Sequence, residues 1–228
     1  MASQLFWQKL CTKRLKYAII TNILMEKLNL KLIKDEYQKR VCNLLFKLKT
    51  HSKETYEHSL DVAAKSYAIA KNFGIDSSDI KTLYTASLLH DIGKLYIETS
   101  LLHKKDATDS EKEIIKLGHI IGTKSILSEF FDADFVKLAS HHHERLNHSG
   151  YPEHLGARKL DILDRILQVA DVASALEMTR SYKEAYKPDQ VISILNDLAT
   201  RGELDAVCVK EIEKIILLST KNQSQFGS

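Results

Sequence analysis

Apolar residues recur at intervals of three and four along almost the whole chain, and no segment alternates apolar and polar residues as a half-buried strand would. This spacing predicts an all-α protein with nine or ten helices. The chain also has only two prolines and eight glycines, so few positions interrupt a helix. We expect helices over residues 5–25, 30–49, 52–73, 79–91, 109 onward, 133–144, 158–178, 188 onward and 206–218.

Capping residues mark several of the predicted helix ends. Gly74 should close the third helix, because glycine tolerates the backbone angles found just after a helix. The segment 108–111, Thr-Asp-Ser-Glu, has the form of a capping box and should open the helix that carries His119. The longest irregular segment is predicted over residues 145–157, which contain two glycines and a proline.

Length, charge and cysteine content narrow the class of protein. A chain of 228 residues suffices for one large domain, or for one domain with a short appendage. Its net charge of +3 comes from 33 basic and 30 acidic residues without a long basic run, so charge gives no reason to expect DNA or RNA binding. Cys11, Cys42 and Cys208 are widely spaced, which argues against a disulfide framework and fits a reducing cytosol. The longest uncharged run near the N-terminus, residues 17–25, is too short to span a bilayer, so we expect a cytoplasmic protein outside the membrane.

The most informative candidate for chemistry is the segment 90–94, His-Asp-Ile-Gly-Lys, at the end of a strongly apolar helical run. Adjacent residues on a helix point about 100° apart, so His90 and Asp91 can reach one centre only where the helix ends or distorts. Taken alone, the pair is equally consistent with a core histidine and a carboxylate that caps a turn.

Other histidines and carboxylates lie on the predicted helices. Glu54 and His58 are four residues apart and therefore share one helix face. Asp171 lies in an otherwise apolar run, where a carboxylate is costly unless it is paired or binds a metal. Each has an ordinary alternative, such as a solvated pair, a surface histidine or a cap, but together they predict a metal site. The candidate ligands are Glu54, His58, His90, Asp91, His119, His142, His143 and Asp171.

The donor set limits the metal and its chemistry. Nitrogen and oxygen donors without sulfur suit iron, manganese or zinc. Eight candidates exceed the needs of one ion, so we expect two or three divalent ions, with Asp91 as the natural bridging carboxylate. Neighbouring ions suit phosphate ester hydrolysis, because they convert a bridging water to hydroxide and neutralise the phosphate oxygens.

Four candidate ligands resemble the ligand pattern of the HD superfamily of metal-dependent phosphohydrolases: His58, His90, Asp91 and Asp171. The segment 142–152, HHERLNHSGYP, resembles the signature of the HD-GYP branch, as do the His-x-x-Gly motif at 119–122 and residues 180–183. The similarity covers residues 50–218. It implies an all-α HD-domain helical bundle and a bacterial second-messenger enzyme that hydrolyses cyclic di-GMP to pGpG or GMP.

The resemblance also implies roles for individual residues. All eight candidate ligands match metal ligands of the family, Glu54 being the extra carboxylate of members with three ions, and the expected ions are Fe or Mn. Asp91 and Lys94 are the expected catalytic residues, with Lys94 contacting the scissile phosphate. Tyr151 is expected to shape the pocket, and two basic residues to hold the distal phosphate or guanine. The expected substrate-binding residues are Lys94, Tyr151, Arg180 and Lys183.

Several positions depart from the family pattern without removing a predicted ligand. The pair 147–148, Asn-His, replaces the usual Asp-Gly, and the pair 173–174, Ala-Ser, replaces Phe-Asp. The other departures, at positions where the family has proline or glycine, are Glu98, Lys105, Asp106 and Ser181. Two alternatives therefore stay open. One is hydrolysis of another cyclic dinucleotide such as cyclic GMP-AMP, or of a linear nucleotide; the other is a module that binds cyclic di-GMP or a diguanylate cyclase without hydrolysis.

The chain is expected to have three parts. Residues 1–49 form an N-terminal helical segment, residues 50–219 form the HD-GYP catalytic domain, and residues 220–228 form a disordered tail. The apolar faces of the first segment, which include Leu10 and Leu44, need covering. We expect them either to pack on the catalytic domain or to form a homodimer.

Overall fold

The computed structural model describes residues 36–179 and 184–224. This part of the chain contains helices joined by turns and loops, with no strand, which confirms the all-α prediction there. The elements are α3 (Glu36–His51), α4 (Lys53–Asn72), α5 (Ser77–Leu89), the 3₁₀-helix η1 (Ile92–Tyr96), α6 (Thr99–Leu102), α7 (Asp109–Ser128), α8 (Ala133–Ser140), α9 (Ile162–Glu177), α10 (Pro188–Thr200) and α11 (Ala206–Ser224).

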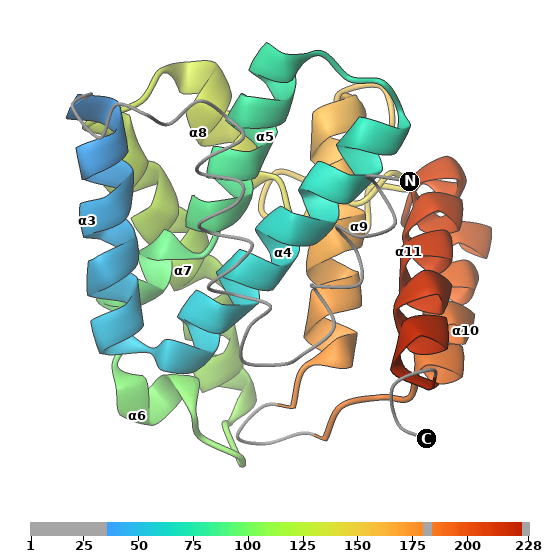
Figure 1. The fold of residues 1–228 in the computed structure, drawn as a ribbon. Helices are drawn as coiled ribbons and strands as arrows, with labels where there is room; N and C mark the ends of the chain where they lie inside the picture. The colour runs from blue at the N-terminus through green and yellow to red at the C-terminus, as the bar shows by residue number, and fades with distance from the viewer. Residues whose placement is uncertain (1–35, 180–183, 225–228) are drawn as a thin grey trace.

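Helix α4 crosses the middle of the molecule, with α5 and α9 packed against it (Figure 1). Helices α10 and α11 form a pair beside α9, whereas α3, α7 and α8 lie on the side of α5 (Figure 1). The helices share one apolar core, whose largest fully buried side chains include Leu48, Ile69, Leu89, Leu127 and Ile166. Since α5 also contacts α9, the C-terminal end of α5 reaches the region between α4 and α9.

Side-chain caps fix two of the helix starts: the start of α7, as the sequence predicts, and the start of α5, which begins at Ser77, two residues before the predicted position. Asp76 Oδ1 accepts hydrogen bonds from the N–H groups of Ser78 and Asp79, at 2.8 and 3.1 Å. The capping box expected over residues 108–111 is present at the start of α7. Gly74 follows α4 with φ of +69°, in the left-handed region that glycine adopts without strain.

Two helices end earlier than predicted, immediately before histidines. Helix α5 ends at Leu89, and η1 begins at residue 92. Helix α8 ends at Ser140 rather than at residue 144, because Nδ1 of His142 bonds to the carbonyl of Ala139 at 2.9 Å. A longer helix would need that carbonyl for the N–H of residue 143. Helix α11 instead continues to Ser224, beyond the predicted residue 218.

The described part of the N-terminal segment packs on the rest of the chain. Val41, Leu44 and Leu48 of α3 are buried, and α3 contacts α4, α5 and η1. The predicted helix over 5–25 and the end of the predicted tail, residues 225–228, lie outside the described residues. Among the helices that the structure describes, none combines the length and apolar character needed to cross a membrane.

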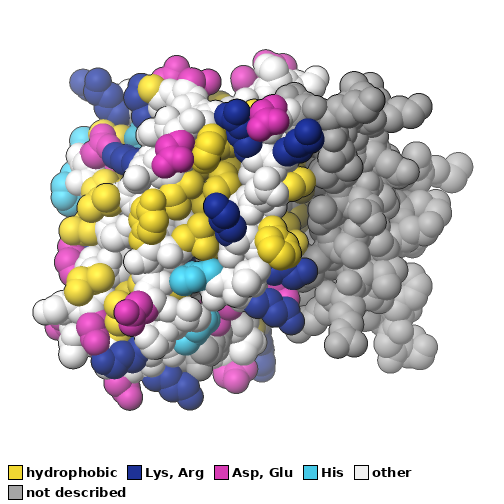
Figure 2. Space-filling model, turned by 90° about the vertical axis from the view of Figure 1, so that its left-hand side faces the viewer, with side chains coloured by type: hydrophobic (Ala, Val, Ile, Leu, Met, Phe, Trp, Pro, Cys, Tyr) yellow, Lys and Arg dark blue, Asp and Glu magenta, His cyan; other side chains and the backbone are white. Residues whose placement is uncertain are grey.

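The surface on the side of α3 is partly apolar. Figure 2 shows hydrophobic side chains gathered in the middle of this face, with basic and acidic side chains interspersed around them. On α3 and η1, Phe46 and Tyr96 are 70% and 64% exposed. A hollow of about 520 Å³ adjoins Phe46 and is also lined by His51 and Leu95.

Candidate metal centre

Several predicted ligands converge in the middle of the bundle from separate elements. His58 lies on α4, His119 on α7 and Asp171 on α9. His90 and Asp91 lie at the turn between α5 and η1. The residues in this group that are at most 6% exposed are His58, His90, Asp91, His119, His142 and Asp171. The group is therefore assembled by the fold and shielded from solvent.

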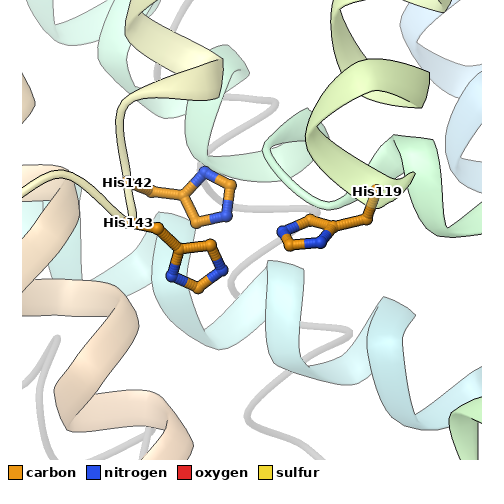
Figure 3. Close-up of side chains that lie close together, drawn as sticks. All are labelled: His119, His142 and His143. Atoms are coloured by element: carbon orange, nitrogen blue, oxygen red, sulfur yellow. The ribbon is translucent and has the colours of Figure 1, made fainter. Parts of the chain in front are cut away.

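The pair that follows α8 completes this group. In Figure 3 the rings of His142 and His143 lie close to the ring of His119, which comes from α7. The ring centroids of His119 and His143 are 5.0 Å apart, and those of His142 and His143 are 4.1 Å apart. The early end of α8 allows two consecutive histidines to face the same partner.

Asp91 lies between two pairs of histidines. Its Oδ2 atom is 3.4 Å from Nε2 of His90 and 3.9 Å from Nε2 of His58. Its Oδ1 atom is 3.9 Å from Nε2 of His119 and 4.0 Å from Nε2 of His142. The two oxygens therefore face different ligands, as a bridging carboxylate requires.

Asp171 approaches the same centre from α9. Its Oδ1 atom is 2.9 Å from Nε2 of His58 and 3.8 Å from Nε2 of His90. The other ring nitrogen of His58, Nδ1, is 3.0 Å from the hydroxyl of Ser174. Ser174 is one of the departures from the family pattern, and it lies behind a ligand without contacting the centre itself. A serine there supplies a neutral hydrogen-bond partner to His58 where the family has a carboxylate.

Three histidines are oriented by main-chain carbonyls. Nδ1 of His90, His119 and His142 lies 2.7, 2.6 and 2.9 Å from a carbonyl oxygen of its own helix or the preceding one. A carbonyl only accepts, so Nδ1 carries the proton and Nε2 presents its lone pair. This arrangement is typical of metal-ligating histidines.

The lone pairs of these histidines have no partner among the residues that the structure describes. The Nε2 atoms of His90, His119 and His142 are buried and without a hydrogen bond. A buried polar atom without a partner is costly, and divalent ions bound in the two ligand groups would satisfy these three atoms. The close ligand groups are His119, His142 and His143, and His58, His90 and Asp91; within each group the ligand atoms lie within 4.8 Å of one another. This nitrogen and oxygen donor set fits iron, manganese or zinc.

Burial and charge set the protonation states of the ligands. Burial lowers the pKa of His119, and it lowers the pKa of His143 to about 3. Burial also holds the pKa of His142 well below the usual value. Burial opposes ionisation of Asp91, but Lys94 and His90 outweigh it and hold its pKa well below the ordinary value. Neutral imidazoles and an ionised carboxylate are the forms that bind metal. At His90 burial is outweighed by Asp91, so the pKa is shifted the other way and is raised.

A family model described as "HD domain" matches residues 38–207, which is most of the chain. This chain belongs to the HD-domain family. The predicted resemblance is thereby confirmed, and curated relatives agree with its HD-GYP branch. A 3′3′-cGAMP-specific phosphodiesterase of Vibrio cholerae is 33% identical over 68% of this chain and 36% of the relative. A cyclic di-GMP phosphodiesterase of Pseudomonas aeruginosa is 32% identical over 65% of this chain and 36% of the relative.

The matched relatives are longer proteins, and this chain spans about a third of their length. Among solved structures, the HD domain of the phosphodiesterase PgpH from L. monocytogenes superposes with a TM-score of 0.60 at 17% identity. That match covers 79% of this chain and 98% of the solved one. The likeness at this identity supports the HD-domain helical bundle as the fold.

Lys94 of this HD domain lies beside the predicted bridging residue. Its Nζ atom is 2.7 Å from Oδ2 of Asp91, and its side chain is 17% exposed. Because Lys94 is on η1, three residues after Asp91, the short helix places an ammonium group at the edge of the buried ligands. This location agrees with a cation that meets a phosphate entering from solvent.

Glu54 lies one helical turn before His58 on α4, but neither close ligand group includes it. Its Oε2 atom is 3.7 Å from Nδ1 of His103, which follows α6. His103 is absent from the predicted ligands, because its sequence neighbourhood carries no motif. Its position beside Glu54 depends on how α6 packs near α4. A role of Glu54 as ligand to a third ion stays a prediction.

Tyr151 lies against the ligand group after α8. Its ring is stacked on the ring of His143, with centroids 4.6 Å apart and an interplanar angle of 25°. Nζ of Lys116 lies 4.6 Å from the centre of the Tyr151 ring. Lys116 is three residues before His119 on α7, a spacing that is the only sequence signal for it. The predicted substrate residues Arg180 and Lys183 lie outside the described residues.

The Asn147-His148 departure keeps a sharp bend in the loop. Asn147 Oδ1 accepts hydrogen bonds from the N–H and hydroxyl of Ser149, at 3.1 and 2.6 Å. His148 has φ of +66°, in the left-handed region that a glycine would adopt more easily. The histidine therefore takes the backbone form that the usual glycine permits, and its ring lies close to Gly156.

Proposed function

We propose that this chain is a metal-dependent phosphodiesterase that hydrolyses cyclic di-GMP to pGpG, GMP or both. The observation that carries the proposal is the set of three buried, unpartnered Nε2 atoms around Asp91, with Lys94 at its edge. Relatives named for hydrolysis of cyclic di-GMP and of 3′3′-cGAMP support the substrate class. The protein is proposed to act in the cytoplasm.

The proposed cofactor is two or three divalent ions, Fe or Mn. The ligands would be His58, His90, Asp91, His119, His142, His143 and Asp171, with Glu54 serving a third ion. Such ions supply an activated water for attack on phosphorus and neutralise charge on the phosphate. The oxygen and nitrogen donors suit iron, manganese or zinc, and the preference for iron or manganese rests on the family resemblance.

The residues of the chain have complementary tasks in this reaction. Asp91 fixes the separation between the two ligand groups, because each of its carboxylate oxygens faces a different pair of histidines. The Lys94 ammonium contacts the phosphate that is cleaved and offsets the negative charge that develops there. Tyr151 and Lys116 form one wall of the substrate site beside His143, and Arg180 and Lys183 hold the distal part of the substrate.

Turnover by metal-loaded protein tests this proposal. Protein loaded with Fe(II) or Mn(II) without oxygen should convert cyclic di-GMP to pGpG or GMP. Chromatography of the reaction mixture detects these products. Lys94→Met should lower kcat about 100-fold with the metal retained, because it removes one charge-stabilising group. Lys112→Met is the matched control, since Lys112 is an exposed residue of α7 paired only with Asp109 in its own helix turn. Full metal occupancy without turnover of any cyclic dinucleotide would contradict the proposal.

A second candidate is hydrolysis of 3′3′-cGAMP. It is favoured by three V. cholerae relatives, each named as specific for that substrate and 29 to 33% identical to this chain. The Asn147-His148 departure lies in the loop that carries Tyr151, so a difference in substrate preference would arise there. A hydrolysis panel with equal concentrations of cyclic di-GMP and 3′3′-cGAMP separates the two, because the true substrate will have the larger kcat/KM.

A third candidate is a non-hydrolysing module that binds cyclic di-GMP or docks a diguanylate cyclase. Tight binding of cyclic di-GMP in calorimetry without product from metal-loaded protein would favour it. The retained set of buried ligands favours the enzyme instead. A homodimer through the N-terminal helices stays a prediction, which sedimentation of the whole chain can check.

A further inference from the structure

Glu144 is a fully buried carboxylate placed directly after the His142-His143 pair, with no exposed surface. Each of its oxygens accepts one main-chain hydrogen bond from the loop that follows. Oε1 accepts from the N–H of Glu153 at 2.7 Å, and Oε2 accepts from the N–H of Leu155 at 2.8 Å. The Glu144 side chain thus joins the backbone next to His143 to the loop at residues 153 and 155.

These two bonds are strong by their nature. A buried carboxylate is costly unless hydrogen bonds satisfy it, and bonds to an ionised acceptor are about twice as strong as neutral ones. Replacing either oxygen by a donor would leave a loop N–H facing another N–H. The loop therefore depends on two acceptor oxygens at this position.

The same loop is fixed at its other end. The N–H of Tyr151 donates to the carbonyl of His143 at 3.1 Å. Gly150 packs so closely on the main chain of Glu144 and Arg145 that a methyl group there would overlap it. Tyr151 is thus held on one side by His143 and on the other by the bonds to Glu144.

The consequence concerns the Tyr151 ring. It stacks on His143, a predicted ligand, and has the Lys116 ammonium over its face. A shift of residues 153–155 would move this wall of the site, whereas His142 and His143 belong to the turn that directly follows α8. The contacts thus separate the position of the loop from the assembly of the ligands.

We propose that Glu144 is a positioning residue that fixes Tyr151 against His143, and so sets the fit of the cyclic dinucleotide. The claim that Glu144 sets the fit of the substrate rests on the proposed function. The claim that Glu144 positions the loop does not, and amide exchange and His143 labelling test it separately. Glu144 acts through the backbone of residues 153–155, because its two oxygens accept from the N–H groups of Glu153 and Leu155.

The test compares Glu144→Gln with Glu153→Gln. Gln keeps the shape of the side chain but turns one acceptor into a donor. Glu153 is the matched control, because it lies on the same loop and its side chain pairs with the surface residue Lys124. Three kinds of measurement are made on the whole chain. The first is hydrogen exchange of the loop amides, and the second is carbethoxylation of His143 in metal-free protein. The third is KM and kcat for cyclic di-GMP, measured on protein whose metal content is also determined.

For Glu144→Gln we expect loop amides 153 and 155 to exchange about tenfold faster, as loss of one such bond implies. Labelling of His143 should rise, because Tyr151 no longer covers it. KM should rise about tenfold, while metal content equals that of the wild type. Glu153→Gln should match the wild type in all three.

Two results would overturn the proposal. One is unchanged amide exchange and unchanged His143 labelling in Glu144→Gln, which would show that the bonds do not hold the loop. The other is faster exchange with KM and kcat unaltered in an active wild type, which would reduce Glu144 to a structural role. A wild type that hydrolyses no cyclic dinucleotide would refute the proposed function separately, and exchange and labelling would still decide whether Glu144 positions Tyr151.

Discussion

Two buried polar clusters join α4 to α9, two helical turns apart. One contains His58 and Asp171, which belong to the metal-ligand group. The other contains Lys65 of α4, which bonds to Asp61 one turn earlier and to Glu177 of α9 at 2.8 Å. Both bring charged groups into the contact between the same pair of helices, yet their chemistry differs.

The Lys65 cluster is complete in itself. The Lys65 side chain is 11% exposed and lies between two carboxylates. Burial alone would lower its pKa, but Asp61 and Glu177 outweigh burial and raise it above the ordinary lysine value. In the metal-ligand group, by contrast, three Nε2 atoms have no protein partner. A cluster satisfied by its own atoms holds helices together, whereas one with convergent unpartnered atoms binds something else.

The largest expected effect comes from removing the residue that faces both ligand groups. Asp91→Ala should lower kcat about a thousandfold or more and abolish metal retention, because both histidine pairs lose their shared carboxylate. Product assays and elemental analysis of the purified variant measure both effects. Asp79→Ala is the control, since Asp79 is an exposed carboxylate in the first turn of α5, the helix that precedes Asp91. Metal retained at the wild-type level in Asp91→Ala would place the ions elsewhere.

A smaller effect of a different kind is expected in the other cluster. Lys65→Met should lower the free energy of unfolding by about 2 kcal/mol, because it leaves two partly buried carboxylates without their cation. Metal content should stay that of the wild type, which separates a structural cluster from a binding one. Urea denaturation of metal-free protein measures the change. Lys112→Met, at an exposed pair of α7, should change stability by less than about 0.5 kcal/mol. A metal loss in Lys65→Met would remove the distinction between the clusters.

The pH dependence of the Lys65→Met difference is the smallest expected effect. The folded pKa of Lys65 is raised, so its contribution is fully present below the unfolded value of about 10.4 and is lost as pH rises through the folded pKa. The difference between wild type and Lys65→Met should therefore be constant between about pH 6 and pH 9. A difference that halves within this window would show that another group carries the effect.

The sequence predicts which candidate ligands converge better than it predicts what surrounds them. His90, Asp91 and Asp171 were predictable because a titratable group at an apolar helix position needs a partner, wherever the helices lie. The Glu153 and Leu155 contacts of Glu144 were not predictable, since they depend on how a loop folds back. The predicted start of α7 is confirmed, because the capping box at Thr108 and Glu111 sets it from local sequence alone.

The remaining errors have physical reasons of the same kind. Helix α8 ended early because the ring of His142 bonds to a carbonyl that the helix would otherwise use, and ring orientation depends on the metal-ligand group. Lys116 and His103 were overlooked because α7 and α6 place them beside Tyr151 and Glu54 through tertiary packing. A buried charged or polar residue is readable from its own helix, whereas the identity of its neighbours depends on how several elements pack.

The metal content of protein prepared without oxygen tests the central claim most directly. Elemental analysis of wild-type protein loaded with Fe(II) or Mn(II), and freed of weakly bound ions, should give two or three ions per chain. Such a value would match the two close ligand groups and a third site at Glu54. Less than one ion per chain under these conditions would contradict the account, because the three buried Nε2 atoms would then remain without a partner.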